Sequence, residues 1–174
     1  MESVSAFELD QITGAIVDAS VQIHRDLGPG LLESVYTSVL ARVLTKRGFG
    51  VEQQKPIRFE YEGLTFSNGF RVDLFVERRV IVELKSIEML AAVHSKQVLT
   101  YLRLMRLPVG LLINFGQATL KAGLKRIVNG LAPMDSPALR INQAVHKDGG
   151  RELDHIVEPD GATSADAPIN ENRS

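Results

Sequence analysis

Two acids and a lysine share one face of an alternating segment near the middle of the chain. Residues 71–86 read RVDLFVERRVIVELKS, and apolar residues occupy every second position of two short runs. Asp73, Glu83 and Lys85 stand between them, so two predicted strands would turn these side chains to one side. Carboxylate oxygens are preferred Mg²⁺ ligands, and a nearby lysine can orient a water or stabilise negative charge. The pattern predicts hydrolysis of a phosphate ester at a divalent cation.

The length of the loop between the strands decides which side chains lie opposite each other. A three-residue loop, 77–79, would set Asp73 opposite Glu83, whereas a five-residue loop would set Asp73 opposite Lys85. A two-residue loop would mix the polar and apolar faces and is disfavoured. The three-residue register is the more economical and is the one predicted. Its facing carboxylates would destabilise the strand pair by roughly 0.2–1 kcal/mol, and a bound cation would reverse that effect. The alternative is a solvent-facing strand surface that carries an Asp–Lys ion pair.

Two predicted helices precede the strands. Apolar residues recur at helical spacing over residues 9–27, a Gly-Pro-Gly triplet at 28–30 interrupts them, and helical spacing resumes over 32–47. Glu33 stands in the first turn of the second helix, where the helix dipole stabilises an acid. Glu33 also shares a helix side with Tyr36, so the alternative is that it faces the sheet as a third acid of the same site.

A further helix is predicted after the hairpin, over residues 90–106. His94, Gln97 and Tyr101 fall on one side of it, next to its apolar positions. Taken singly, each residue is most simply a hydrogen-bonded side chain at the edge of the core. Taken together, on the element that follows Lys85, they indicate the wall of a pocket.

The remaining segments complete the order of elements. Period-two spacing predicts a strand over 51–62, the apolar run VGLLINF predicts a buried strand over 109–115, and 117–129 is predicted as a last helix. The order α-α-β-β-β-α-β-α predicts one mixed α/β domain over residues 1–130, with a central sheet flanked by helices. Residues 131–174 lose this periodicity and carry eight acids and four bases, which predicts a flexible C-terminal tail.

The composition of the 174-residue chain excludes several kinds of site. No cysteine is present, which excludes disulfides, thiolate zinc sites and a cysteine nucleophile. Residues 1–130 hold 16 bases and 13 acids, a mildly basic balance that permits nucleic acid as a partner. No apolar run approaches the roughly 20 residues that span a bilayer, and the N-terminus lacks the features of a signal peptide. We therefore expect a cytoplasmic protein with no membrane partner.

The hairpin resembles the core of the PD-(D/E)XK nucleases. In that superfamily an Asp on one strand and an (Asp/Glu)-X-Lys triplet on the next form a metal site, and the matching residues here are Asp73 and Glu83-Leu84-Lys85. One departure is Val72, which stands where many members have a proline.

Two further motifs carry the resemblance beyond the hairpin. Gln97 and Tyr101 are similar to a Gln-x-x-x-Tyr extension found in some nuclease branches. The run GLLESVY at 30–36 resembles the signature of the GxxExxY proteins, as do VELKS at 82–86 and GLLINFG at 110–116.

This resemblance implies a restriction-endonuclease-like fold and a nuclease that uses Mg²⁺, or alternatively Mn²⁺. The implied metal ligands are Glu33, Asp73, Glu83 and the backbone carbonyl of Leu84. The implied catalytic residues are Asp73, Glu83, Lys85, Gln97 and Tyr101, with Lys85 positioning or activating the attacking water. The implied contacts to the nucleic-acid backbone are Arg71, Lys96 and Arg103, and His94 and Tyr36 would line the site.

The resemblance implies nucleic acid as the partner, with DNA favoured over RNA, and is compatible with a homodimer or a protein partner. Two alternatives stay open at this point. The chain could be a non-catalytic module that binds nucleic acid or protein on the same fold. The acids and the lysine could also have structural roles alone.

Overall fold

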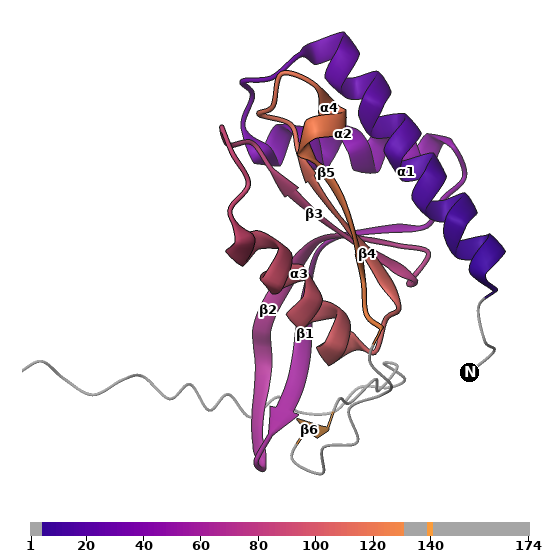
Figure 1. Ribbon diagram of the computed structural model, residues 1–174. Helices are drawn as coiled ribbons and strands as arrows, with labels where there is room; N and C mark the ends of the chain where they lie inside the picture. Colours follow the sequence, from indigo (N-terminus) through magenta and orange to yellow (C-terminus); the bar gives the residue numbers. More distant parts are fainter. Residues whose placement is uncertain (1–4, 131–138, 141–174) are drawn as a thin grey trace, which may run out of the picture. The chain divides into compact units, whose positions relative to one another are not determined.

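The computed structural model describes residues 5–130 and 139–140 (Figure 1). In chain order the elements are α1 (Ala6–Leu27), α2 (Glu33–Lys46), β1 (Val51–Tyr61), β2 (Leu64–Val76), β3 (Val80–Lys85), α3 (Ala92–Met105), β4 (Val109–Asn114), α4 (Leu120–Gly123), β5 (Leu124–Val128) and β6 (Leu139–Arg140). The tail predicted over 131–174 lies outside the described residues apart from β6, and its flexibility stays a prediction.

The strands form one mixed sheet in the order β5-β4-β3-β2-β1-β6. Strands β3 and β4 run parallel, and the other neighbouring pairs are antiparallel. Helices α1 and α2 cover one face, and α3 lies against the other (Figure 1). The predicted mixed sheet flanked by helices is therefore confirmed.

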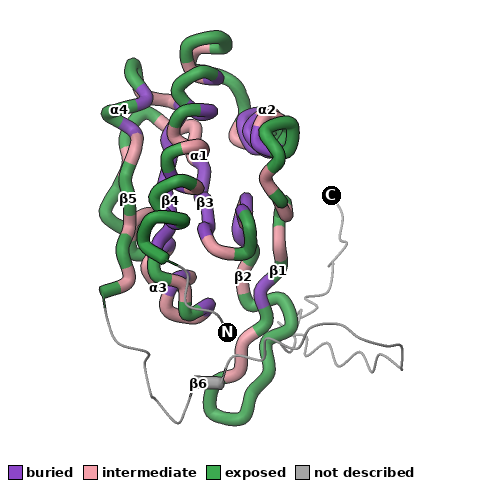
Figure 2. The backbone as a smooth tube through the Cα atoms, turned by 90° about the vertical axis from the view of Figure 1, so that its right-hand side faces the viewer, coloured by how far each residue is buried: buried purple, intermediate pink, exposed green. Residues whose placement is uncertain are grey.

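Each face of the sheet has its own apolar core. The cluster under α1 and α2 includes Ile16, Tyr36, Leu40, Leu74, Val82, Leu84, Leu111, Ile113 and Phe115. The cluster under α3 includes Ile57, Val72, Ile81, Val98, Leu102 and Leu112. Since β3 and β4 contribute to both clusters, they are covered on both faces, as their continuous apolar sequences require (Figure 2).

The hairpin of β2 and β3 has the predicted three-residue register. Val76 pairs with Val80 and Leu74 pairs with Val82. Glu77 and Arg78 take left-handed backbone conformations, with φ angles of 51° and 52°, which closes the loop tightly. Regular pairing of the two strands ends at Leu74 and Val82. Asp73 and Glu83 are therefore the first residues beyond the paired part, where the strands separate.

One apolar residue of this hairpin packs on the face opposite to the predicted one. Val72 was expected to share a face with Leu74, but it packs in the cluster under α3, whereas Leu74 packs under α1 and α2. The regular pairing of β2 is interrupted between these two residues, beside a left-handed residue of β1, Gln54 with φ 48°. Strict alternation therefore fails at Asp73.

The last predicted helix, 117–129, is wrong. Only one turn, α4, is helical, and β5 then pairs antiparallel with β4. At Gly123 an added Cβ would lie 2.2 Å from the carbonyl oxygen of Asn114, so the chain passes directly against β4 there. Strand pairing outweighs the weak helical tendency of this segment.

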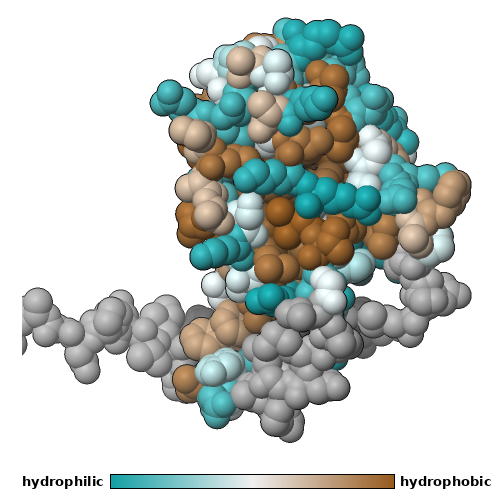
Figure 3. All heavy atoms as spheres, viewed as in Figure 1, coloured by the Kyte–Doolittle hydropathy of each residue, from teal (hydrophilic) through white to brown (hydrophobic). Residues whose placement is uncertain are grey.

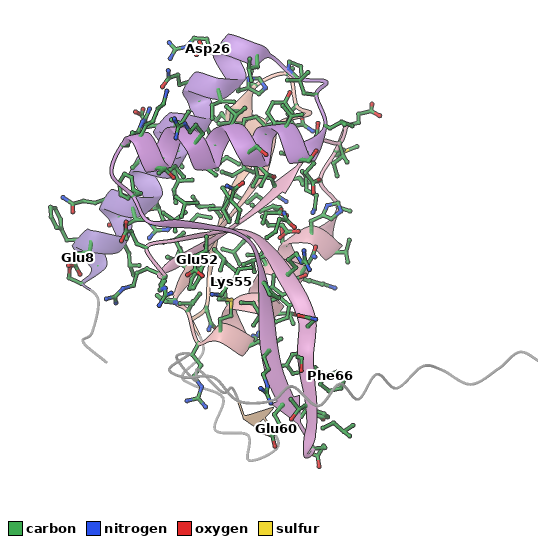
Figure 4. The ribbon with its side chains drawn as sticks, turned by 180° about the vertical axis from the view of Figure 1, so that it is seen from behind. Glu8, Asp26, Glu52, Lys55, Glu60 and Phe66 are labelled. Carbon is green, nitrogen blue, oxygen red and sulfur yellow. The ribbon has the colours of Figure 1, made fainter. Side chains whose placement is uncertain are left out.

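The β1–β2 hairpin is much longer than the predicted strands, because β2 begins at Leu64. Its outer part, residues 57–70, is here called the hairpin arm. Residues 61–69 are all exposed, and Figure 2 shows this end of the hairpin in green. Figure 4 places Glu60 and Phe66 near the free end of the arm, away from Glu52 and Lys55.

Candidate active site

Asp73 lies at the point where β2 and β3 separate. One carboxylate oxygen, Oδ2, accepts the backbone amide of Leu84 at 2.8 Å. The other, Oδ1, accepts the side-chain amide of Gln54 at 2.9 Å. A side chain thus replaces the strand-to-strand hydrogen bond at this position, and the carboxylate is fixed between three strands.

Gln54 reaches Asp73 because its backbone is left-handed. Its neighbours on β1 keep the ladder with β2, since Gln53 pairs with Leu74 and Lys55 with Val72. The left-handed residue between these pairs turns its side chain toward Asp73. Sequence reasoning missed Gln54, because a left-handed conformation at a residue other than glycine leaves no pattern in the sequence.

Glu83 is a buried acid on the central strand β3. Its side chain is only 7% exposed, and Oε1 accepts a hydrogen bond from Nζ of Lys85 at 2.8 Å. Oε2 is fully buried and has no hydrogen-bond partner among the described residues. An unpartnered buried carboxylate oxygen is costly, so this atom is a candidate ligand for a cation or a bound water.

Burial raises the proton affinity of this carboxylate. The pKa of Glu83 is raised to about 7, chiefly by burial, with the negative charge of Asp73 adding to the effect and Lys85 opposing it. Burial lowers the pKa of Lys85, but the hydrogen bond and charge of Glu83 outweigh this, and the pKa is raised overall. Lys85 is therefore a persistent ammonium group beside an acid that ionises only near neutral pH.

Glu33 approaches the same lysine from α2. Its Oε1 lies 3.8 Å from Nζ of Lys85, so the ammonium group lies between Glu33 and Glu83. The pKa of Glu33 is raised, chiefly by burial, while Lys85 opposes this effect and Asp73 adds to it. The sequence left two alternatives open for Glu33, and the structure places it beside Lys85 near the sheet acids with its side chain 41% exposed. Its role as a metal ligand stays a prediction.

Tyr36 positions the loop that leads into Glu33 at the start of α2. Its hydroxyl donates to the carbonyl of Gly28 at 2.6 Å and accepts the amide of Leu31 at 3.2 Å. Its ring is fully buried and stacks on Phe115, with centroids 4.3 Å apart. Tyr36 therefore acts through the loop, as a positioning residue.

The segment that follows Lys85 is held by the buried side-chain amide of Asn114. Asn114, at the end of β4, accepts the amide of Ile87 at 3.0 Å and donates to its carbonyl at 2.8 Å. Its Oδ1 also accepts the amide of Gly116 at 3.1 Å, and Ser86 donates to the carbonyl of Leu31 at 2.6 Å. These bonds fix the segment that follows Lys85, and sequence reasoning assigned no role to Asn114.

Comparison with known proteins agrees with this geometry. A family model of the PD-(D/E)XK nuclease superfamily matches residues 10–127, more than half of the chain. The chain belongs to the PD-(D/E)XK nuclease superfamily. No curated protein and no solved structure matches the chain. The finer resemblance to the GxxExxY proteins stays a prediction.

The acids of the PD-(D/E)XK motif, Asp73 and Glu83, are suited to hold a divalent cation with two carboxylates rather than three. Within residues 5–130, no three His, Cys, Asp or Glu side chains are grouped closely enough to hold a metal ion together. The predicted set of Glu33, Asp73 and Glu83 is thus not preassembled, since Lys85 lies between the two glutamates. Asp73 and the unpartnered Oε2 of Glu83 remain, and one or two carboxylates with water and phosphate can satisfy Mg²⁺.

The polar residues of α3 form a separate group in the structure. Gln97 donates to the hydroxyl of Tyr101 at 2.7 Å, and the Tyr101 ring stacks on Phe70 at 4.0 Å. Nδ1 of His94 accepts the amide of Ala91 at the start of the helix. In the described part of the chain, no hydrogen bond joins Gln97 or Tyr101 to the acids of β2 and β3.

The three predicted backbone-binding residues differ in accessibility. Arg71 and Lys96 are exposed on β2 and α3, as contact with a phosphate backbone requires. Arg103 is half-buried, and its Nε is buried without a hydrogen-bond partner among the described residues.

None of the helices in the described residues is long and apolar enough to cross a membrane.

Proposed function

We propose that this chain is a metal-dependent nuclease that hydrolyses phosphodiester bonds of nucleic acid, with DNA as the first substrate to test and Mg²⁺ or Mn²⁺ as the cofactor. The observation that carries the proposal is the buried, unpartnered Oε2 of Glu83, which lies beside Lys85 and under the negative field of Asp73. Membership of the superfamily supports the reaction class.

The proposed roles follow from the contacts of each residue. Asp73 and Glu83 would hold the cation, with the Leu84 carbonyl as a further proposed ligand. When bound, the cation would polarise the phosphate and acidify an attacking water. The positive cation would then offset the negative charge of the buried Glu83 carboxylate. Lys85 would be free to donate a hydrogen bond to the attacking water.

The remaining residues would position this pair. Tyr36 and Ser86 hold the loop at Leu31, which fixes Glu33 beside Lys85. Glu33 would keep the lysine charged and oriented once Glu83 turns to the cation. Gln97 and Tyr101 would support the substrate path along α3 rather than the cation itself.

Cleavage of a substrate panel tests the proposal. Purified protein is incubated with linear, circular and single-stranded DNA and with RNA, in Mg²⁺, Mn²⁺ or EDTA. We expect metal-dependent cleavage that Glu83→Gln and Lys85→Ala each reduce by roughly 100-fold or more. Glu88→Gln and Lys121→Ala change matched exposed residues outside the site and should leave the rate unchanged. Cleavage at the wild-type rate in both site variants would refute the assignment.

A second candidate is a binding module without catalysis. It is favoured by one observation, namely that both oxygens of Asp73 already have hydrogen-bond partners. This function requires that no substrate is cut in any metal and that Glu83→Ala still binds nucleic acid as wild type does.

A further inference from the structure

The hairpin arm, residues 57–70, extends beyond the apolar clusters after Ile57, and aromatic rings line it. Two strands alone are only marginally stable in water, and among the described residues the arm has little other cover. In the described residues β6 pairs only with Glu60 and Tyr61. Exposed apolar side chains remain at the free end, where Tyr61 is 51%, Leu64 63% and Phe66 41% exposed. Figure 3 shows brown side chains at this lower end of the described body.

Four rings form a continuous row, here called the aromatic ladder. Phe66 stacks on Phe59 at 4.8 Å and 18°, and Phe59 lies 6.4 Å from Phe70. Phe70 stacks on Tyr101 of α3 at 4.0 Å and 13°. Gly69 makes room for the row, since a Cβ there would lie 2.1 Å from the Phe59 ring. The ladder therefore runs from a partly buried end at α3 to an exposed end at Phe66.

The partly buried end of the ladder lies on the same face of the sheet as the candidate active site. Phe70 and Tyr101 pack against the cluster under α3, which contains Ile81 of β3. Glu83 and Lys85 follow Ile81 at every second position, so their side chains leave β3 on that same face. A nucleic-acid strand that is bound at Asp73 and Glu83 and extends toward the hairpin arm would therefore contact the rings one after another.

The chemistry of the arm favours nucleobases over phosphates as its ligand. Residues 57–70 carry one base and two acids, so the arm has almost no net charge and offers little attraction to a polyanion. Flat aromatic faces stack on any base, but bases inside a duplex are already stacked on each other. We propose that the aromatic ladder binds unpaired nucleobases, so that the substrate enters the site as a single strand. This inference rests on the proposed nuclease function and names its substrate class.

Binding of short oligonucleotides in EDTA tests the ladder without cleavage. The probes are a labelled 12-nucleotide thymidine strand, its duplex with adenosine and an abasic strand of the same length, followed by fluorescence anisotropy. We expect wild type to prefer the thymidine strand to both other probes. We expect Phe66→Ala to weaken binding of that strand roughly 5-fold or more. Phe7→Ala removes a ring of α1 that is 70% exposed, more than the 41% of Phe66, and should change nothing.

Two further variants separate stacking from general apolar contact. Phe66→Tyr keeps an aromatic face and should bind as wild type does, whereas Phe66→Leu keeps apolar bulk and should bind as weakly as Phe66→Ala. Because the lost contact is to a base, the salt dependence of binding should stay the same in every variant. Phe66 is exposed at the end of the arm, so these variants are expected to keep the wild-type melting temperature.

Several outcomes would overturn the ladder proposal. These are no binding of the single strand by wild type, full binding by Phe66→Leu, and an equal loss with the abasic strand. A wild-type dimer that Phe66→Ala dissociates, measured by light scattering, would make the ladder a contact between copies and also refute the proposal. Cleavage by wild type with no effect of Phe66→Ala on binding would reject the ladder alone. Loss of binding without any cleavage would reject the nuclease alone.

Discussion

The carboxylate of Asp73 accepts the backbone amide of Leu84 at 2.8 Å, one residue beyond the last regular pair of β2 and β3. The two strands open at this bond, and the opening is where Asp73 and Glu83 approach each other from neighbouring strands. One side chain therefore has a structural role that is present without any cation, and a proposed ligand role that depends on one. Experiments must separate these roles.

Truncation of Asp73 is expected to destabilise the metal-free protein. Asp73→Ala leaves the partly buried amide of Leu84 without an acceptor, which should lower the free energy of unfolding by about 1–3 kcal/mol. Asp73→Asn keeps one oxygen that can accept this amide and should cost less. Urea unfolding in EDTA measures both values. Gln54→Ala is the control, because it removes only the exposed contact to Oδ1, and equal stability of Asp73→Ala and wild type would contradict the prediction.

The stability of the metal-free protein should fall as the pH rises from about 5 to 8. The folded protein keeps the Glu83 proton up to a pKa of about 7, whereas the unfolded chain releases it near the ordinary value of 4.5. The unfolded state therefore binds fewer protons in this window, and the unfolding free energy decreases with pH, by at most about 3 kcal/mol from this residue. Denaturation in EDTA at several pH values measures the slope.

Substitution of the same residue provides the control for this slope. Glu83→Gln cannot ionise, so its stability should depend much less on pH over the same window. A smaller slope should remain, because the pKa of Glu33 is also raised and acts in the same direction. Identical slopes for wild type and Glu83→Gln would contradict the prediction.

Removal of Lys85 should separate cation binding from catalysis. Since its ammonium group lies 2.8 Å from Glu83, it competes with a cation for that carboxylate. Lys85→Ala should therefore keep or enlarge the rise in melting temperature caused by Mg²⁺, while cleavage falls roughly 100-fold or more. Differential scanning fluorimetry with a Mg²⁺ titration measures the first effect. A melting temperature of Lys85→Ala that no longer responds to Mg²⁺ would assign the lysine to the metal site itself.

Loss of the Tyr36 hydroxyl should weaken the site through the loop. Tyr36→Phe keeps the stack on Phe115 but loses the bonds to Gly28 and Leu31, which should cost about 1–2 kcal/mol of unfolding free energy. Because the loop places Glu33 beside Lys85, cleavage should also fall at temperatures where the variant is fully folded. Tyr61→Phe, on the exposed end of β1, is the matched control, and an unchanged cleavage rate in Tyr36→Phe would limit that hydroxyl to stability.

The parts of the fold that the sequence predicted are those with a strong local period. The register of the β2–β3 hairpin followed from alternation together with the three-residue loop. The same logic misplaced Val72, because the regular pairing of β2 is interrupted at Asp73 and alternation does not continue across an irregularity in the backbone. The segment 117–129 failed for another reason, since its pairing with β4 depends on contacts far away in the chain.

The candidate site divides in the same way. Asp73, Glu83 and Lys85 were predictable because charged residues interrupt an apolar pattern at regular positions. Gln54 and Asn114 were not predictable, because their roles rest on hydrogen bonds to segments far away in the chain. Gln54 bonds Asp73 at 2.9 Å, and Asn114 bonds the backbone of Ile87 at 2.8 and 3.0 Å. Such contacts depend on the folded geometry, and neither residue type nor spacing signals them.

The left-handed backbone of Gln54 should also affect how readily copies of this protein aggregate through the border strand β1. β1 borders the sheet, and among the described residues β6 covers only its far end, so the stretch from Val51 to Phe59 could recruit a strand from another molecule. Gln54 breaks the regular row of donors and acceptors along that border, and Pro56, two residues later, has no amide to offer. We therefore expect the residue that supports Asp73 also to protect this border of the sheet against edge-to-edge aggregation.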